Sequence, residues 1–273
     1  MVYINIIIWT RKKYKNASEF KDKICLITGG SSGIGRGIAL EFGRLGANVI
    51  VADIQENSKI GKYHDTDIKT TTTEEIINNG GKSEFIKCDC SEYSDLEKLV
   101  SSIEKKFKKI DILINNAGIH IPGSIEEQSI EDWDKVMSIN LRSIYALSKL
   151  SLKLIKNSTS GRIINIASVN AFRGGLGPAY APSKSGVLNL TRDMAITLGK
   201  YNITVNAICP GYIETPIQDY NTPDSIKKFL STLPIQRLGK PKDIAHTAKF
   251  FASKDSEWIT GSYLVVDGVG EGV

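Results

Sequence analysis

Tyr180 and Lys184 are the pair of residues whose types and spacing point most directly to chemistry. Residues four apart on a helix share one face, about one turn apart. A phenol has a pKa of about 10 and is a poor base at neutral pH, but a nearby ammonium favours the phenolate and lowers that pKa. We therefore expect Tyr180 to exchange a proton with an alcohol or a carbonyl compound. Seen alone, the pair also fits an ordinary surface contact.

Ser168 stands directly after the apolar run Ile163–Ala167, where a strand is expected to end. Its hydroxyl could hydrogen-bond a substrate oxygen and orient it for proton transfer. The alternative is a structural one, in which the hydroxyl caps the end of the strand.

The segment Thr28–Gly35 reads TGGSSGIG and lies between an apolar run and a helical pattern. Glycine allows a sharp turn and a close approach of the backbone to a ligand. The helix that follows offers free N–H groups and the positive end of its dipole to a pyrophosphate. A glycine-rich turn with a strand before it and a helix after it predicts a dinucleotide site, with a purely structural turn as the alternative.

Asp53 closes the second expected strand, 18 residues after Gly35. A carboxylate at this distance reaches the ribose hydroxyls of the adenosine, and it repels a 2′-phosphate by ~4 kcal/mol at ~4 Å and an effective dielectric of ~20. The residue before Gly33 is Ser32 and not a basic one. Asp53 therefore favours NAD over NADP, unless it is only a turn former at the end of a strand.

Taken together, these motifs make the sequence resemble the classical branch of the short-chain dehydrogenase/reductase family from about residue 23 to residue 268. Thr28–Gly35 matches the family's TGxxxGIG turn, and Asn115–Gly118 matches its NNAG segment. The segment from Pro210 to Thr215 matches the part that holds the nicotinamide. The residues that match the catalytic tetrad are Asn140, Ser168, Tyr180 and Lys184.

The resemblance implies an NAD-dependent oxidoreductase that interconverts an alcohol and its carbonyl. It implies that Asn140 holds a water that relays protons to Lys184, and that Asp89 contacts the adenine. Homotetramers are common in the family, formed through its two long helices and the C-terminal end of the chain. The residues that the resemblance and the turn chemistry assign to the cofactor are Gly29, Ser31, Ser32, Gly33, Ile34, Gly35, Asp53, Asp89, Cys90, Asn116, Gly118, Tyr180, Lys184, Ile213 and Thr215.

Two other functions remain open at this point. A 3-oxoacyl carrier-protein reductase shares the whole tetrad, but it usually prefers NADPH and needs a basic docking surface. A dinucleotide-binding regulator without turnover is the alternative of another class, although a regulator has no need to retain the tetrad.

Strand and helix patterns alternate along the chain, which predicts one doubly wound α/β Rossmann domain at 23–273, with a mostly parallel sheet flanked by helices on both faces. Residues 1–22 are expected to form an extension outside the fold, and the long polar segment 55–75 to form a surface loop or a lengthened start of a helix. The expected strands are 24–28, 48–52, 83–87, 110–114, 162–167, 203–208 and 263–266. The expected helices are 34–45, 65–78, 94–107, 131–156, 180–199 and 241–252.

Composition and charge exclude several other classes of protein. The net charge is +5, but residues 24–273 carry 29 basic and 28 acidic residues, so nucleic acid is not an expected partner. The chain has no run of about 18 apolar residues, so no membrane span is expected. The four cysteines have no zinc-ligand spacing and are expected to be reduced, in the cytoplasm, and no metal site is expected.

We expect the substrate to be a small alcohol or carbonyl compound. The expected pocket includes His120, Asn170, Phe172, Tyr212 and residues 214–230. Because His120, Asn170 and Gln218 could bind several hydroxyl groups, we favour a sugar or polyol.

Overall fold

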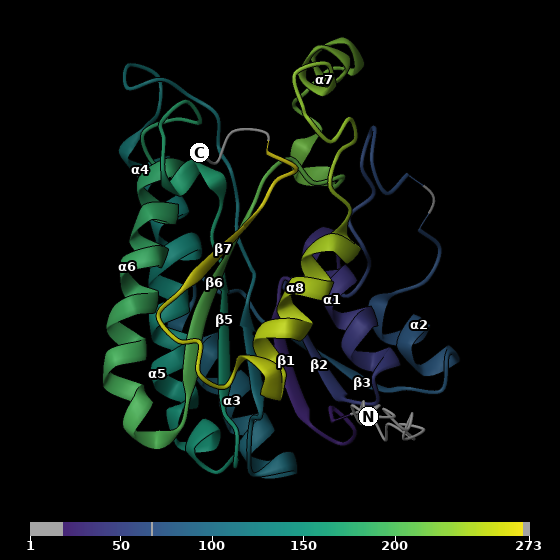
Figure 1. Ribbon diagram of the computed structural model, residues 1–273, viewed down its shortest axis with the longest axis vertical. Helices are drawn as coiled ribbons and strands as arrows, with labels where there is room; N and C mark the ends of the chain where they lie inside the picture. The colour runs from purple at the N-terminus through teal and green to yellow at the C-terminus, as the bar shows by residue number, and fades with distance from the viewer. Residues whose placement is uncertain (1–18, 67, 270–273) are drawn as a thin grey trace, which may run out of the picture.

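The computed structural model describes residues 19–66 and 68–269, which form a seven-stranded parallel sheet with helices on both faces (Figure 1). The strand order is β3-β2-β1-β4-β5-β6-β7, and every neighbouring pair is parallel. The expected α/β doubly wound fold is therefore confirmed. The strands are β1 Ile24–Thr28, β2 Asn48–Asp53, β3 Lys82–Lys87, β4 Ile112–Asn115, β5 Arg162–Ile166, β6 Thr204–Pro210 and β7 Tyr263–Val266.

Two layers of helices cover the sheet. Helices α1, α2 and α8 pack together on one face, and α3, α5 and α6 lie on the other (Figure 1). The α-helices are α1 Gly33–Arg44, α2 Thr72–Asn78, α3 Tyr93–Phe107, α4 Ile130–Met137, α5 Ser143–Lys156, α6 Tyr180–Leu198, α7 Pro223–Leu230 and α8 Pro241–Ala252. Short 3₁₀ turns span Val169–Ala171, Gly199–Tyr201, Pro216–Gln218 and Lys254–Ser256, and a π-helical turn spans Ser138–Arg142.

The central strands are apolar on both faces because each face is covered by helices. In β1, Ile24 and Leu26 join the core under α3, α5 and α6, whereas Cys25 and Ile27 join the core under α1 and α8. Side chains of a strand point alternately to opposite faces, so one short apolar run contributes to both cores. This explains why the strands were recognisable as continuous apolar runs in the sequence.

The helices differ from expectation in three places. The run expected as one helix over 131–156 is divided by the π-helical turn Ser138–Arg142. The helix expected over 65–78 begins only at Thr72, where Thr71 and Glu74 form a capping box. Helix α7 at Pro223–Leu230, with Thr222 as its N-cap, was not predicted as a helix.

The fold also begins slightly earlier than residue 23. Phe20 is buried and stacks edge-on against Phe42 of α1, with ring centroids 5.3 Å apart. Asp22 donates its backbone N–H to the carbonyl of Gly46 at 2.9 Å. The rest of the expected extension, residues 1–18, lies outside the described residues. Within the described part of the chain, no helix has the length and apolar character needed to cross a membrane.

The strand order reverses between β1 and β4, and this reversal places the site. From β1 the chain moves outward to β2 and β3, and then returns to pair β4 with the other side of β1. At such a switch point the connections leave the carboxyl ends of the two strands in opposite directions, which opens a crevice. The carboxyl ends here are Thr28 and Asn115.

Candidate active site

A cavity of about 960 Å³ opens at the carboxyl ends of the strands and runs from Asp53 to Tyr180. This volume lies at the upper end of the usual range for ligand pockets, about 300–1,000 Å³. The cavity is lined by most of the residues predicted from the sequence, namely Gly29, Ser32, Gly33, Ile34, Asp53, Asp89, Cys90, Asn116, Gly118, Ser168, Tyr180, Lys184, Ile213 and Thr215. Ser31, Gly35 and Asn140 are not among its lining residues.

The glycine turn is held tightly enough that side chains would not fit. Gly29 has a φ of +64°, and Gly33 has a φ of +52°. A Cβ built on Gly35 would lie 2.0 Å from the carbonyl oxygen of Gly29, so α1 packs directly against the turn. Gly33 and Ile34 place the first N–H groups of α1, which have no partner within the helix, at the cavity wall. This cradle fits the diphosphate of a dinucleotide.

Asn116 holds the glycine turn to the neighbouring strand. Its side-chain amide donates to the carbonyl oxygens of Thr28 at 2.9 Å and Gly29 at 3.0 Å. In return, the hydroxyl of Thr28 accepts from the backbone N–H groups of Asn116 at 3.0 Å and Ala117 at 3.1 Å. Asn116 therefore shapes the cavity through the turn, although it also lines it.

Asp53 ends β2 beside the turn. Its carboxylate accepts from the backbone N–H of Ser31 at 3.0 Å and from that of Ile54 at 2.8 Å. Burial raises the pKa of this carboxyl, and the hydrogen bond from Ser31 opposes the shift. Asp89 and Cys90 line the same end of the cavity, and Asp89 is fixed by Ser91, whose hydroxyl donates to it at 2.7 Å.

Tyr180 opens helix α6, and Lys184 lies one turn further along it. The ammonium of Lys184 is 5.8 Å from the centre of the Tyr180 ring and donates to the carbonyl of Ile166, at the end of β5, at 2.9 Å. Tyr180 and Lys184 lie on the same face of α6, as expected, because both side chains line the cavity.

The expected lowering of the phenol's pKa is not found for the protein alone, because the net shift is upward. Burial raises the pKa of Tyr180 to about 12, and the hydrogen bond with Ser168 opposes that shift. Burial also lowers the pKa of Lys184 to about 8. Both shifts have the same cause, since a site sheltered from water disfavours each charged form.

Ser168 lies just beyond β5 and points its hydroxyl at the phenol. The hydroxyl takes part in a hydrogen bond with Tyr180 and accepts from the backbone N–H of Asn170 at 3.1 Å. The second contact makes Ser168 the N-cap of the turn Val169–Ala171. Ser168 therefore has a capping role, at the turn rather than at the end of the strand, and its contact with a substrate oxygen stays a prediction.

Asn140 is fully buried in the π-helical turn Ser138–Arg142. Its side chain accepts from the N–H of Ile119 at 2.8 Å and donates to the carbonyl of Ile119 at 2.9 Å. The Oδ1 of Asn140 and the Nζ of Lys184 each lie 3.4 Å from the point where a Cβ on Gly118 would sit, so they flank this glycine. A π turn inside a helix is a frequent feature of functional sites.

His120 lies between the two aromatic rings of the substrate end. Its ring centroid is 5.2 Å from that of Tyr180 and 5.1 Å from that of Tyr220. Its Nε2 is 3.2 Å from the carbonyl oxygen of Leu176, and burial lowers the pKa of His120. Of the expected pocket residues, His120, Asn170, Tyr212 and Gln218 line the cavity, and Phe172 instead packs against Tyr263.

The sequence interpretation did not single out Gln55 and Lys59, which line the cavity next to Asp53. Both belong to the long polar segment after β2. The unusual length of that segment was the available signal, but a polar loop has no pattern that tells where its residues will lie.

The chain is similar to several known proteins over most of its length. The model of the family described as enoyl-(acyl carrier protein) reductase matches residues 29–268. A 3-oxoacyl-(acyl-carrier-protein) reductase of Thermotoga maritima is 34% identical over 251 residues, which is 92% of this chain and 98% of that protein. A 2-dehydro-3-deoxy-D-gluconate 5-dehydrogenase of Dickeya dadantii is 35% identical over 257 residues, which is 93% of this chain and 97% of that protein.

A solved structure with the same fold is that of the aldohexose dehydrogenase of Thermoplasma acidophilum in ligand-free form. It has a TM-score of 0.79 and 31% sequence identity, and the match covers 92% of this chain and 94% of that one.

Proposed function

The chain belongs to the classical short-chain dehydrogenase/reductase family, and on that premise we propose that it is an NAD-dependent enzyme that interconverts a secondary alcohol of a sugar or polyol and its carbonyl. The single observation that carries this proposal is one cavity that joins the glycine cradle and Asp53 at one end to Ser168, Tyr180 and Lys184 at the other.

Asp53 supports the choice of NAD over NADP. Its carboxylate is fixed at the end of β2 by the N–H groups of Ser31 and Ile54. A fixed carboxylate can accept from ribose hydroxyls and repels a 2′-phosphate. Lys59 is the basic residue that lines the same end of the cavity, so a direct comparison of the two cofactors is the decisive measurement.

In this proposal Tyr180 moves the proton. When bound, the nicotinamide accepts or returns the hydride. Tyr180 takes the proton of the alcohol hydroxyl during oxidation and gives it back during reduction of the carbonyl. Ser168, already hydrogen-bonded to the phenol, holds the reacting oxygen in place. Lys184 favours the phenolate by its charge. Asn140 fixes the backbone of Ile119 through its side-chain amide.

The polar groups at the substrate end favour a compound with several hydroxyls. A carbonyl oxygen only accepts, so the contact with Leu176 requires that Nε2 of His120 carry the hydrogen. Because burial lowers its pKa, the ring stays neutral and its Nδ1 is an acceptor. Together with Asn170 and Gln218, it gives the cavity acceptors and donors for hydroxyls next to the reacting carbon. Two proteins similar to this chain are named as dehydrogenases of a deoxygluconate and an aldohexose.

A 3-oxoacyl carrier-protein reductase is the second candidate, because a relative of that name is 34% identical over nearly its full length. Asp53 and the nearly neutral charge of residues 24–273 favour the first candidate. An acetoacetyl thioester as substrate separates the two.

We also propose a homotetramer in the cytoplasm. Cys25, Cys88, Cys90 and Cys209 are all buried and free, as expected of a protein in a reducing compartment. The partners proposed are the cofactor and a small alcohol or carbonyl substrate.

The test is a spectrophotometric screen of sugars, polyols and simple alcohols for NADH production. We expect turnover with a polyhydroxy compound and NAD⁺, and at least about tenfold lower kcat/KM with NADP⁺, which corresponds to about 1.4 kcal/mol. Tyr180→Phe should still bind NADH but lose turnover. Near-normal turnover in this variant would refute the mechanism. A preference for NADPH and an acetoacetyl thioester would instead establish the second candidate.

A further inference from the structure

Residues 54–66, which we call the strap, leave the end of β2 and run over to the segment before α7 (Figure 1). In the figure the strap is the dark blue chain that rises toward the green segment that precedes α7. The strap therefore links a part of the molecule next to the cofactor cradle with a part next to the substrate pocket.

On the cofactor side, the strap is tied to the glycine turn. The hydroxyl of Ser58 donates to the carbonyl of Ser31 at 2.6 Å, and the N–H of Lys59 donates to the hydroxyl of Ser32 at 2.7 Å. Arg36 of α1 is buried beneath this contact and donates to Ser58 at 3.2 Å.

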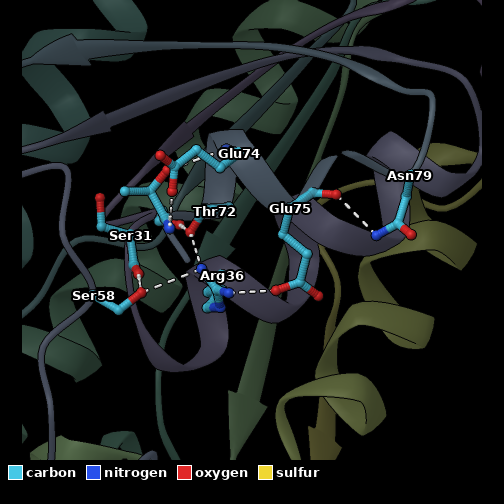
Figure 2. Close-up of polar contacts among 9 residues, drawn as sticks. Ser31, Arg36, Ser58, Thr72, Glu74, Glu75 and Asn79 are labelled. Atoms are coloured by element: carbon cyan, nitrogen blue, oxygen red, sulfur yellow. Dashed lines mark hydrogen bonds and ion pairs between the residues drawn. The ribbon is translucent and has the colours of Figure 1, made fainter. Parts of the chain in front are cut away.

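The same guanidinium joins the strap to helix α2. It donates to the hydroxyl of Thr72 at 3.1 Å and pairs with the carboxylate of Glu75, as Figure 2 shows. This end of the strap is consequently held in place by the buried guanidinium of Arg36, which has several partners.

On the substrate side, the side chain of Asp219 hydrogen-bonds the strap. The carboxylate of Asp219 accepts the backbone N–H of Lys62 at 2.6 Å and that of Tyr63 at 3.2 Å. Asp219 follows directly after the turn Pro216–Gln218. The fit leaves no space, because a Cβ on Gly61 would lie 2.8 Å from the Oδ2 of Asp219 and 2.1 Å from the carbonyl oxygen of His64.

Other residues of the two segments that this contact joins line the cavity. Gln55 and Lys59 of the strap line one part of it, and Gln218 and Tyr220, the neighbours of Asp219, line another. The ring of His64 also packs against Tyr212, with centroids 6.4 Å apart. A dinucleotide held from Asp53 to Tyr180 thus has the strap on one side and the Asp219 segment on the other.

We propose that Asp219 is a positioning residue that fastens the strap to the substrate segment, so that release of the cofactor requires this contact to open. The inference rests on the proposed function for the identity of the cofactor. It assigns a role to the long segment after β2 and explains why one carboxylate spans 157 residues of sequence to bind two backbone N–H groups.

The first test needs no cofactor. Hydrogen exchange measured by mass spectrometry on the full chain reports the amides of Lys62 and Tyr63, which Asp219→Ala leaves without their acceptor. We expect exchange in peptides covering 59–66 to rise by about tenfold, because charge-assisted hydrogen bonds are the stronger ones. Asp224→Ala is the matched control, since it removes the same charge from the first turn of α7. It should leave exchange in the strap unchanged.

The second test measures cofactor release. NADH dissociation, followed by its fluorescence after mixing with excess NAD⁺, should be about three- to tenfold faster in Asp219→Ala than in the wild type. The KM for NAD⁺ should rise by a similar factor, while kcat at saturating NAD⁺ should not fall. If Asp219 only stabilised the fold, Asp219→Ala would also lower kcat. If loss of a negative charge were the cause, Asp224→Ala would release NADH faster as well.

Gly61→Ala serves if Asp219→Ala does not fold, because its added methyl would press on the carbonyl oxygen of His64 and on the Oδ2 of Asp219 and displace the strap, while the carboxylate itself is kept. It should give the same two effects. Unchanged strap exchange, or faster exchange with an unchanged NADH release rate, would overturn the inference. Absence of NADH binding by the wild type would instead overturn the proposed function.

Discussion

Tyr180 and Lys184 are the pair that moves the proton in the proposed reaction, and burial shifts the pKa of each so that its neutral form is favoured. Burial raises the pKa of the phenol to about 12 and lowers that of the amine to about 8. A phenol with a raised pKa is ready to give a proton to a carbonyl at neutral pH. Oxidation needs the phenolate, so its rate should increase as pH rises.

Ser168→Ala tests this balance. The hydrogen bond from Ser168 lowers the pKa of Tyr180 against the larger effect of burial, so its loss raises that pKa further. We expect the rising limb of kcat/KM for oxidation to move to higher pH, and the rate to fall by about 100-fold, as when one donor to a developing oxyanion is lost. The pH profiles of the wild type and of Ser168→Ala in the oxidative direction provide the measurement. A limb that stays in place would show that Ser168 does not act on the phenol.

The sequence predicted which residues would meet, but it did not predict the sign of the shift on Tyr180. Spacing along a helix is local, and it places Tyr180 and Lys184 on one face whatever surrounds them. The pKa of each group depends on burial and on neighbours that are distant in sequence, such as Tyr220, whose charge interaction raises the pKa of Tyr180, and Ile166, whose carbonyl accepts from Lys184. The spacing of residues along the helix therefore could not predict the direction of the pKa shift on Tyr180.

At the scale of elements, strands were easier to predict than helix boundaries. The run Ile24–Thr28 matches β1 residue for residue, because a strand buried on both faces leaves a continuous apolar signal. The π turn at Ser138–Arg142 has no such signal, since its residues continue the helical pattern on either side. Asn140 was identified from its family motif, whereas its partner, the backbone of Ile119, depends on the tertiary fold.

The packing of α1 against the glycine turn gives a prediction at the same scale. In Gly35→Ala the new methyl would meet the carbonyl oxygen of Gly29 at 2.0 Å and the side chain of Asn116 at 2.5 Å. The turn has to shift, so we expect NADH affinity to fall by at least about tenfold and the protein to lose about 1–3 kcal/mol of stability. Fluorescence titration and urea unfolding measure the two effects.

Gly199→Ala is the matched control, because a Cβ there meets no atom within 4 Å. It should leave NADH affinity unchanged and cost little stability. If Gly35→Ala bound NADH as tightly as the control, the close contact between α1 and the turn would not be needed for the cofactor.

For the whole molecule, the described surface has apolar side chains where the proposed tetramer needs them. Trp258, which lies between α8 and β7, is 97% exposed, and Ile196 on α6 is 81% exposed. Strand β7 is an edge strand in which Tyr263 and Leu264 are also exposed. Monomers rarely leave apolar patches and sheet edges open to water, so these two surfaces are the expected contacts between copies of the chain.

Light scattering after size exclusion tests this assembly, with an expected mass four times that of the 30.0 kDa chain. Because a tetramer with two kinds of interface separates into dimers when one kind is lost, Trp258→Lys and Ile196→Lys should each give dimers. Ile125→Lys is the control. Ile125 is equally exposed, but it belongs to the segment between β4 and α4 and not to α6, to β7 or to the segment between α8 and β7. It should remain a tetramer. A wild-type mass of one chain would contradict the proposal, and dimers from all three variants would show that the added charge, and not the loss of these contacts, separates the subunits.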